Sequence, residues 1–196
     1  MTRKLLFMMT AEQALAFARR VEAAERGDGA AACELGDCYR VGAGGLRYSP
    51  QQTFHWYSRS ALAGDANGQC NLGACYEHGL GCAQSYVKAV KWYRRSAAQA
   101  LGTATMNLGY CTLWGHGVPI DKAEALRLFR LALEQGEEKA RPEVERLEGT
   151  VKKHSIRLVD ASEAGTHFGN VGVSGVASAS DAAAELSEAT ESRRES

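Results

Sequence analysis

Cysteine and histidine are the residues of this chain best suited to chemistry, and it contains six and five of them. The segment Cys75-x2-His78-x3-Cys82, with Cys70 upstream, has the short ligand spacing that zinc sites use. However, the places equivalent to Cys82 in the neighbouring segments hold leucine and valine, so that position is apolar wherever the pattern recurs. We therefore predict buried cysteines here and no metal site.

The other cysteines also follow the pattern of a hydrophobic core. Cys38, Cys75 and Cys111 each lie three residues after a recurring leucine, on the side of a predicted helix that should meet the next helix. Free cysteine often serves as a small buried hydrophobe. Two pairs of cysteines, Cys33/Cys38 and Cys70/Cys75, are each separated by five residues. On a helix this separation points the two side chains roughly 140° away from each other. We expect reduced thiols, and disulfides between helices are the alternative.

The histidines give no sign of a catalytic centre. His55, His78 and His116 do not recur in phase with a serine or cysteine nucleophile, and His116 lies inside a Gly-His-Gly turn. No phosphate-binding loop, dinucleotide fingerprint or hydrolase elbow occurs in the chain. We predict a non-enzyme with no catalytic residues and no cofactor; a cysteine-based hydrolase or a metal-binding protein is the distant alternative.

The cysteines lie within an internal repeat, which sets the expected architecture. A Leu-Gly pair occurs at Leu35, Leu72 and Leu108, at intervals of 37 and 36 residues. An aromatic pair follows at Trp56–Tyr57 and Trp92–Tyr93, and again, degenerate, as Leu128–Phe129. A fixed period in this range is typical of helical solenoids. The missing Cβ of the glycine would let the second helix approach the first closely.

Each repeat also contains helix boundary signals. The first helix stops at a glycine-rich turn, and the second starts at a capping residue: Ser49, Ser85 or Asp121. The resulting organisation is an N-terminal segment 1–28 with a capping helix, repeats at 29–65, 66–102 and 103–137, and a C-terminal capping helix at 138–149. Residues 151–196 are rich in Ser, Ala, Glu and Gly, which predicts a disordered tail; a short strand at Ile156–Val159 is the alternative.

Together these residues resemble the Sel-one-like repeat family, a relative of the tetratricopeptide repeat. The shared pattern is Ala-x3-Leu-Gly-x2-Tyr, Gly-x-Gly, a capped start and Lys-Ala-x2-Trp-Tyr-x3-Ala, and the middle repeat matches it best. The third repeat departs from it at Thr112 and Leu128–Phe129, and the first at Thr53. The resemblance implies an all-α fold, an α/α right-handed superhelix (solenoid) of helix-turn-helix repeats whose first helices line a concave surface. It also implies an adaptor or scaffold.

Charge and hydropathy exclude other classes of protein. The formal net charge is 0, from 23 basic and 23 acidic residues, which argues against a nucleic-acid partner. No apolar run approaches the roughly 18 residues of a membrane helix, so we expect no membrane insertion. Leu5–Met9 is shorter than the apolar core of a signal peptide, about 7–15 residues. A cytoplasmic location is the expectation.

The concave face is the predicted partner-binding site. Residues two before and two or five after each recurring leucine turn away from the second helix, at about 100° per residue. Two asparagine amides just before the leucines could pair with an extended peptide backbone; a bond inside their own helix pair is the equal alternative. The predicted site comprises Cys33, Asp37, Arg40, Cys70, Asn71, Ala74, Glu77, Met106, Asn107, Tyr110 and Leu113.

The sequence thus predicts a non-enzymatic adaptor or scaffold that binds a protein or peptide in its concave groove. The alternative is a regulatory or chaperone-like subunit of one enzyme complex, bound through the convex face or the tail. Arg127 and Arg130 lie on the second helix of the third repeat, outside the predicted groove. Charge reversal at these two arginines is therefore the control for charge reversal in the groove. The sequence does not identify the partner.

Overall fold

The computed structural model describes residues 10–43 and 46–150, and this part of the chain is helical without strands. The helices are α1 (Ala11–Glu25), α2 (Gly29–Val41), α3 (Pro50–Leu62), α4 (Ala66–His78), α5 (Tyr86–Ala97), α6 (Gly102–Trp114) and α7 (Lys122–Glu134); the 3-10 helix η3 (Glu138–Ala140) and helical residues 141–150 follow. The predicted all-α class is confirmed. None of these helices is both long and apolar enough to cross a membrane. The predicted tail at 151–196 lies outside the described residues.

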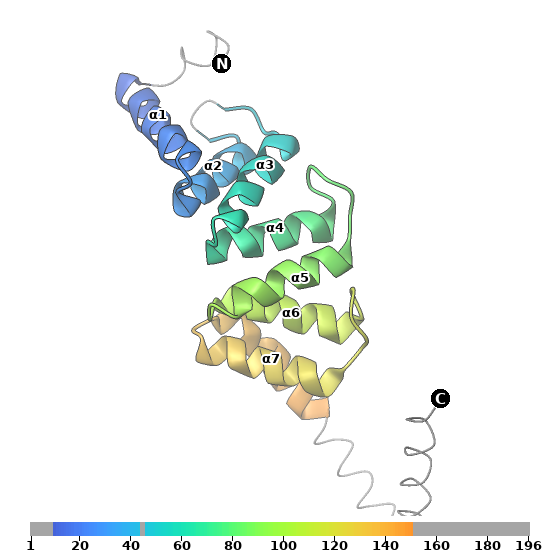
Figure 1. Ribbon diagram of the computed structural model, residues 1–196. Coiled ribbons are helices and arrows are strands. Elements are labelled where there is room, and N and C mark those ends of the chain that lie inside the picture. Colours follow the sequence, from blue (N-terminus) through green and yellow to red (C-terminus); the bar gives the residue numbers. More distant parts are fainter. Residues whose placement is uncertain (1–9, 44–45, 151–196) are drawn as a thin grey trace, which may run out of the picture. The chain divides into compact units, whose positions relative to one another are not determined.

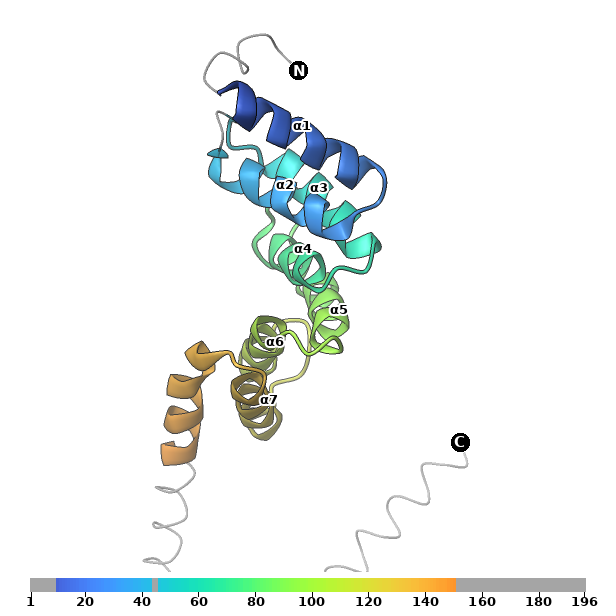
Figure 2. The same cartoon turned by 90° about the vertical axis from the view of Figure 1, so that its left-hand side faces the viewer.

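Three helical hairpins follow one another along the chain (Figure 1). The hairpins are α2/α3, α4/α5 and α6/α7, and each also packs on the next through its second helix, α3 on α4 and α5 on α6. The helix α1 packs on α2, and Figure 2 shows the two lying side by side. Each repeat therefore contacts its neighbours in sequence, as expected for a solenoid.

Local capping bonds fix where the helices of each hairpin begin and end. The side chains of Ser49, Ser85 and Asp121 accept backbone N–H bonds at the starts of α3, α5 and α7, as the sequence predicts. The first helices end at glycines in the left-handed conformation, with φ of 69° at Gly79 and 76° at Gly115. In the second repeat, Ala100 occupies the place of the glycine that closes the other second helices, and its φ is 60°.

The glycine of each Leu-Gly pair holds the two helices of a hairpin close together. A Cβ built at Gly73 would lie 2.7 Å from the Tyr93 ring, and one at Gly109 would lie 2.9 Å from the Phe129 ring. Carbon atoms normally stay about 3.5–4.0 Å apart. The aromatic ring of the second helix therefore occupies the space that a side chain at the glycine would need.

The hydrophobic core follows the stack of hairpins. Tyr57 and Tyr93 are 2% and 1% exposed, but Trp92 is only half-buried, with the Arg95 guanidinium 4.5 Å from its ring centre. The prediction that both aromatic pairs are core residues is therefore wrong for Trp92, which lies at the edge of the hairpin. After α7, Val144 and Leu147 of the last helical segment are buried in the same cluster as Phe129.

Candidate functional site

A groove of about 290 Å³ opens between α2 and α4, the first helices of adjacent repeats. Its lining comprises Ala30, Cys33, Glu34, Asp37, Asp65, Asn67 and Asn71. Three of these, Cys33, Asp37 and Asn71, belong to the predicted binding face. The sequence reasoning missed the other four. Asp65 and Asn67 lie at the start of α4, in the next repeat, which it did not include, and Ala30 and Glu34 lie on α2 outside the positions that it selected.

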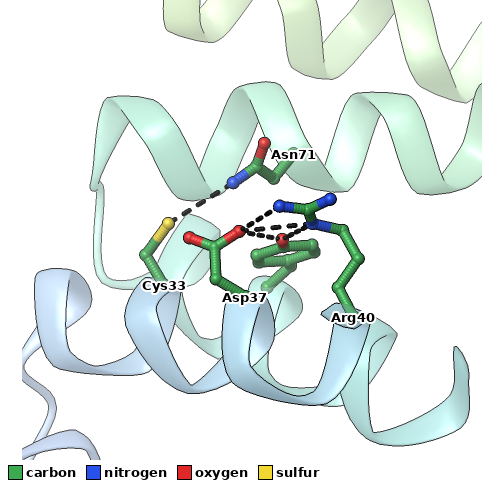
Figure 3. Close-up of polar contacts among 5 residues, drawn as sticks. Cys33, Asp37, Arg40 and Asn71 are labelled. Atoms are coloured by element: carbon green, nitrogen blue, oxygen red, sulfur yellow. Dashed lines mark hydrogen bonds and ion pairs between the residues drawn. The ribbon is translucent and has the colours of Figure 1, made fainter. Parts of the chain in front are cut away.

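An amide-to-thiol hydrogen bond crosses this groove (Figure 3). The Nδ2 of Asn71 donates to the Sγ of Cys33 at 3.5 Å, and Asn107 donates to Cys70 in the same way at 3.7 Å. Both sequence interpretations of these asparagines miss this partner, which lies on the first helix of the preceding repeat. The side-chain carbonyl of this groove-lining Asn71 is without a hydrogen-bond partner within residues 10–43 and 46–150.

The charged residues of the predicted face support buried tyrosines. The Tyr57 hydroxyl donates to Oδ1 of Asp37 at 2.7 Å, and Arg40 donates to both groups (Figure 3). In the second repeat the Tyr93 hydroxyl donates to Glu77 at 2.5 Å. Burial is the main cause that raises the pKa of both tyrosines, with the acceptor carboxylate second, so both remain donors at neutral pH.

The third repeat supports this interpretation, because its equivalent ring lacks the hydroxyl. Phe129 packs edge-on against Tyr110, with ring centres 4.9 Å apart, in place of a hydrogen bond to a carboxylate. Each buried tyrosine hydroxyl is thus matched by a carboxylate, and the equivalent positions hold Tyr110 and Leu113 where that hydroxyl is absent. The predicted residues Asp37, Arg40 and Glu77 therefore have a structural role.

The open face is narrower than the sequence suggested. Met106 and Leu113 are 9% and 7% exposed, in one cluster with Phe129 and Val144, so they are not on an open surface. Their helix is covered by the segment after α7, which packs where the next repeat would. Two more predicted residues, Cys33 and Cys70, are buried at 8% and 6% because neighbouring first helices pack through these positions. Of the remainder, Arg40 is exposed, and Asp37, Asn71, Ala74, Glu77, Asn107 and Tyr110 are half-buried. The binding role of the set stays a prediction.

An exposed aromatic lies beside Tyr110. The Trp114 ring stacks on Tyr110 with ring centres 4.8 Å apart, and Trp114 is 54% exposed. Sequence reasoning missed Trp114, although its i+4 spacing from Tyr110 puts both on one helix face. Exposed tryptophan and tyrosine are frequent energetic anchors of protein interfaces, which makes this pair a second candidate contact.

The cysteines are poorly suited to nucleophilic chemistry. All six are free, and burial raises the pKa of Cys33 to about 11 and those of Cys75 and Cys111 to about 12. A thiol is nucleophilic and metal-binding as the thiolate, which these three thiols do not form at neutral pH. Cys38 and Cys82 are only half-buried, which corrects the prediction of a fully buried cysteine core. His78 is exposed while Cys75 is buried, so the two do not face one site.

Stacked helical hairpins with a groove between their first helices define this chain as an α-solenoid repeat protein. The family model described as "Sel1 repeat" matches residues 29–65, 66–101 and 103–137. The chain therefore belongs to the Sel1 repeat family, in agreement with the resemblance found in the sequence. No functionally curated protein matches the chain.

Solved structures support this fold assignment. A Sel1 repeat protein from Oxalobacter formigenes is 33% identical, with a TM-score of 0.57 over 60% of this chain and 48% of that chain. The protein c5321, a protective antigen of uropathogenic Escherichia coli with an SLR fold, is 36% identical, with a TM-score of 0.60 over 63% of this chain and 26% of that one. The match therefore spans about half and about a quarter of these two proteins.

Helicobacter pylori cysteine rich protein B shares the fold alone, at 24% identity and a TM-score of 0.52 over 67% of this chain and 93% of that chain. Sel1 repeats commonly mediate protein–protein interaction and are generally non-catalytic.

Proposed function

We propose that this protein is a non-enzymatic adaptor that binds an extended segment of a partner protein in the groove between α2 and α4. The observation that carries the proposal is the half-buried Asn71 on the groove wall, whose amide is fixed by its bond to Cys33 and whose carbonyl is unused within the described residues. A side-chain amide held in this way can accept a hydrogen bond from a peptide N–H.

The charges of the groove favour main-chain recognition over a strongly charged ligand. The three carboxylates that line it already have partners: Glu34 pairs with Arg20 at 2.6 Å, Asp37 with Arg40 at 3.1 Å, and Asp65 caps α4 through the backbone N–H of Gly68. The volume of about 290 Å³ lies at the small end of ligand pockets, about 300–1,000 Å³. The groove therefore suits a few residues of an extended chain.

A cytoplasmic location is part of the proposal. Cys70, Cys75 and Cys111 serve as small buried side chains of the core, a use of cysteine that suits a reducing compartment. Mass spectrometry of protein isolated from its native cells, with thiols alkylated before lysis, should find six alkylated cysteines. Recovery of disulfide-linked pairs would contradict this location.

Selection from a random-peptide display library tests the groove directly. Peptides enriched on the wild-type protein should lose at least about tenfold in affinity for Asn67→Arg, about 1.4 kcal/mol, because the longer, charged arginine side chain would obstruct the groove. Asn67 is exposed at the groove rim, near the start of α4, so the variant should fold normally.

The matched control is Gln52→Arg, an equally exposed substitution near the start of α3 that lies outside the groove lining. Selected peptides should bind this control with wild-type affinity. Equal binding to both variants, or failure to select any peptide, would refute the groove. The selected peptides could instead bind both variants with wild-type affinity and lose affinity when the charges of Arg127 and Arg130 of α7 are reversed. That result would favour the alternative, a regulatory or chaperone-like subunit bound through its other face.

A further inference from the structure

The second helix of the middle repeat carries a concentration of positive charge that the rest of the fold does not explain. Lys88, Lys91, Arg94 and Arg95 lie within the 12 residues of α5, all four are exposed, and the helix contains no acidic residue. The whole chain has a formal net charge of 0, so this excess is local. A helix face of one sign, without internal partners, is unusual in such a chain.

Most arginines outside this helix form ion pairs within the described residues. The ion pairs found within residues 10–43 and 46–150 all use arginines of other segments: Arg20, Arg26, Arg40, Arg127, Arg130, Arg141 and Arg146. None of them includes a cation of α5. Seven of the ten arginines outside α5 in the described residues are therefore paired, and Arg19, Arg47 and Arg59 are not. What distinguishes α5 is that it holds four cations, none of them in an ion pair within this part of the chain, on one helix.

The repeat supplies an internal comparison at equivalent positions. The places of Lys88, Lys91, Arg94 and Arg95 are taken in α3 by Gln52, His55, Ser58 and Arg59, and in α7 by Glu124, Arg127, Arg130 and Leu131. In α7 the two arginines are neutralised, Arg127 by Glu124 at 2.7 Å and Arg130 by Glu148 at 2.6 Å. Arg59 of α3 also has no ion pair in the described residues and lies 5.4 Å from the centre of the Trp56 ring, so one stacked arginine belongs to the repeat pattern. The cluster of four unpaired cations is confined to the middle repeat.

Two of the cations are held in place by aromatic rings. The Arg95 guanidinium lies 4.5 Å from the centre of the Trp92 ring, and the Lys88 ammonium lies 5.2 Å from that of Tyr76. These contacts fix the long side chains without neutralising them, which lowers the entropy lost when they bind an anion. Residues 88, 91 and 95 share one helix face and span about 10 Å along it.

We propose that the exposed face of α5 is a second docking surface, for an acidic segment of a partner protein. Charge complementarity selects this occupant: three or four cations over about 10 Å match a short run of aspartate or glutamate side chains, as an extended segment or an acidic helix face presents them. The groove between α2 and α4 is formed by other helices, so one molecule could hold two partners. The inference does not depend on the groove.

The extent of the patch favours an acidic protein segment over a nucleic acid or a membrane. A phosphate backbone would need cations that continue along the solenoid, and the equivalent arginines of α7 are paired while α3 has one cation at these positions. The four cations of α5 reach only the lower limit of the polybasic clusters that bind membranes, about 4–8 cations, and its Ala89, Val90 and Tyr93 pack in the core instead of being free to enter a bilayer. The patch is confined to one helix of three turns.

Fluorescence anisotropy with a fluorescein-labelled, glutamate-rich peptide tests the proposal on the full chain. The wild-type protein should bind this probe with an affinity that falls as salt rises, because the interaction is between exposed charges. The double variant Lys91→Glu with Arg95→Glu should bind at least about tenfold more weakly. Lys91→Gln with Arg95→Gln should give an intermediate loss, and thermal unfolding should show that both variants are folded.

The matched control is Arg127→Glu with Arg130→Glu, which changes the net charge of the chain by the same amount. It should bind the probe within about twofold of wild type, as should the groove variant Asn67→Arg. No binding to wild type, or equal losses in the α5 and α7 variants, would overturn the proposal. So would tighter binding, at the same salt, of single-stranded RNA or of phosphatidylserine vesicles. Failure of the groove proposal would appear only when the binding of library-selected peptides to Asn67→Arg is measured. The two proposals can therefore fail separately.

Discussion

Substitution of Gly73 by alanine measures how closely the two helices of a repeat approach. In an open helix this change stabilises by about 1 kcal/mol, because alanine loses less backbone entropy. At Gly73 the new Cβ would lie 2.7 Å from the Tyr93 ring, so the helices must separate by about 1 Å to reach normal contact. Such overpacking costs about 1–3 kcal/mol. We therefore expect a net loss of up to about 2 kcal/mol.

The fold contains its own control in Gly149, a helical glycine whose added Cβ would meet nothing within 4 Å. Gly149→Ala should stabilise by up to about 1 kcal/mol, so the two alanine variants should differ by about 1–3 kcal/mol. Urea denaturation followed by circular dichroism measures both. In a Tyr93→Ala background, which removes the ring, Gly73→Ala should become neutral or stabilising, with a coupling energy of about 1–3 kcal/mol.

Stabilisation by Gly73→Ala as large as that by Gly149→Ala would contradict the close contact between Gly73 and the Tyr93 ring. So would a loss at Gly73 that persists unchanged when the Tyr93 ring is removed. Either result would mean that the close helix contact is not what limits this position to glycine.

Three further predictions follow from the buried polar groups and the backbone. Tyr93→Phe removes the hydroxyl that donates to Glu77 and should cost about 1.5–3 kcal/mol in urea denaturation, as expected for a bond to a charged group; a loss below about 0.5 kcal/mol would show that the bond contributes little. Ala100→Gly should raise the thermal midpoint by a few degrees, gaining up to about 1 kcal/mol, because φ at Ala100 is 60°; a lower midpoint would contradict the strain. In the unfolded chain the thiols ionise near pH 9.0, whereas burial raises the pKa of Cys75 and Cys111 to about 12 in the folded chain. Between these two pH values the unfolded chain releases protons that the folded chain keeps, so a rise in pH favours unfolding. The urea midpoint should thus be flat up to about pH 8.5 and fall above pH 9; an unchanged midpoint at pH 10 would contradict the thiol burial.

The repeat and its hairpins could be predicted from the sequence because each signal is local. A capping Ser49, a left-handed Gly79 and the Leu-Gly pair at Gly73 act within one or two turns of chain, and three copies in register confirm one another. The burial of Trp92, in contrast, could not be predicted from local signals. Its phase put it in the core, but its burial depends on the edge of the hairpin, which periodicity does not define.

The candidate site was harder to predict because it forms between repeats. The helical angle around one helix put Asp37 on the predicted face, and Asn71 was included for its amide, but neither observation could show that Asn71 would bond to Cys33 of the preceding repeat. Nor could they show that the segment after α7 would cover Met106. Contacts between elements far apart in sequence decide both outcomes, and a single-helix projection contains no information about them.

Chemical-shift mapping by NMR, with isotope-labelled protein and a library-selected peptide, is the most direct test of groove binding. Ala30, Cys33 and Asn71 line the groove, and their backbone amide signals should shift most, while those of α7 should change little. Shifts concentrated on α7 or on the exposed face of α5, with the groove amides unchanged, would contradict the proposed function.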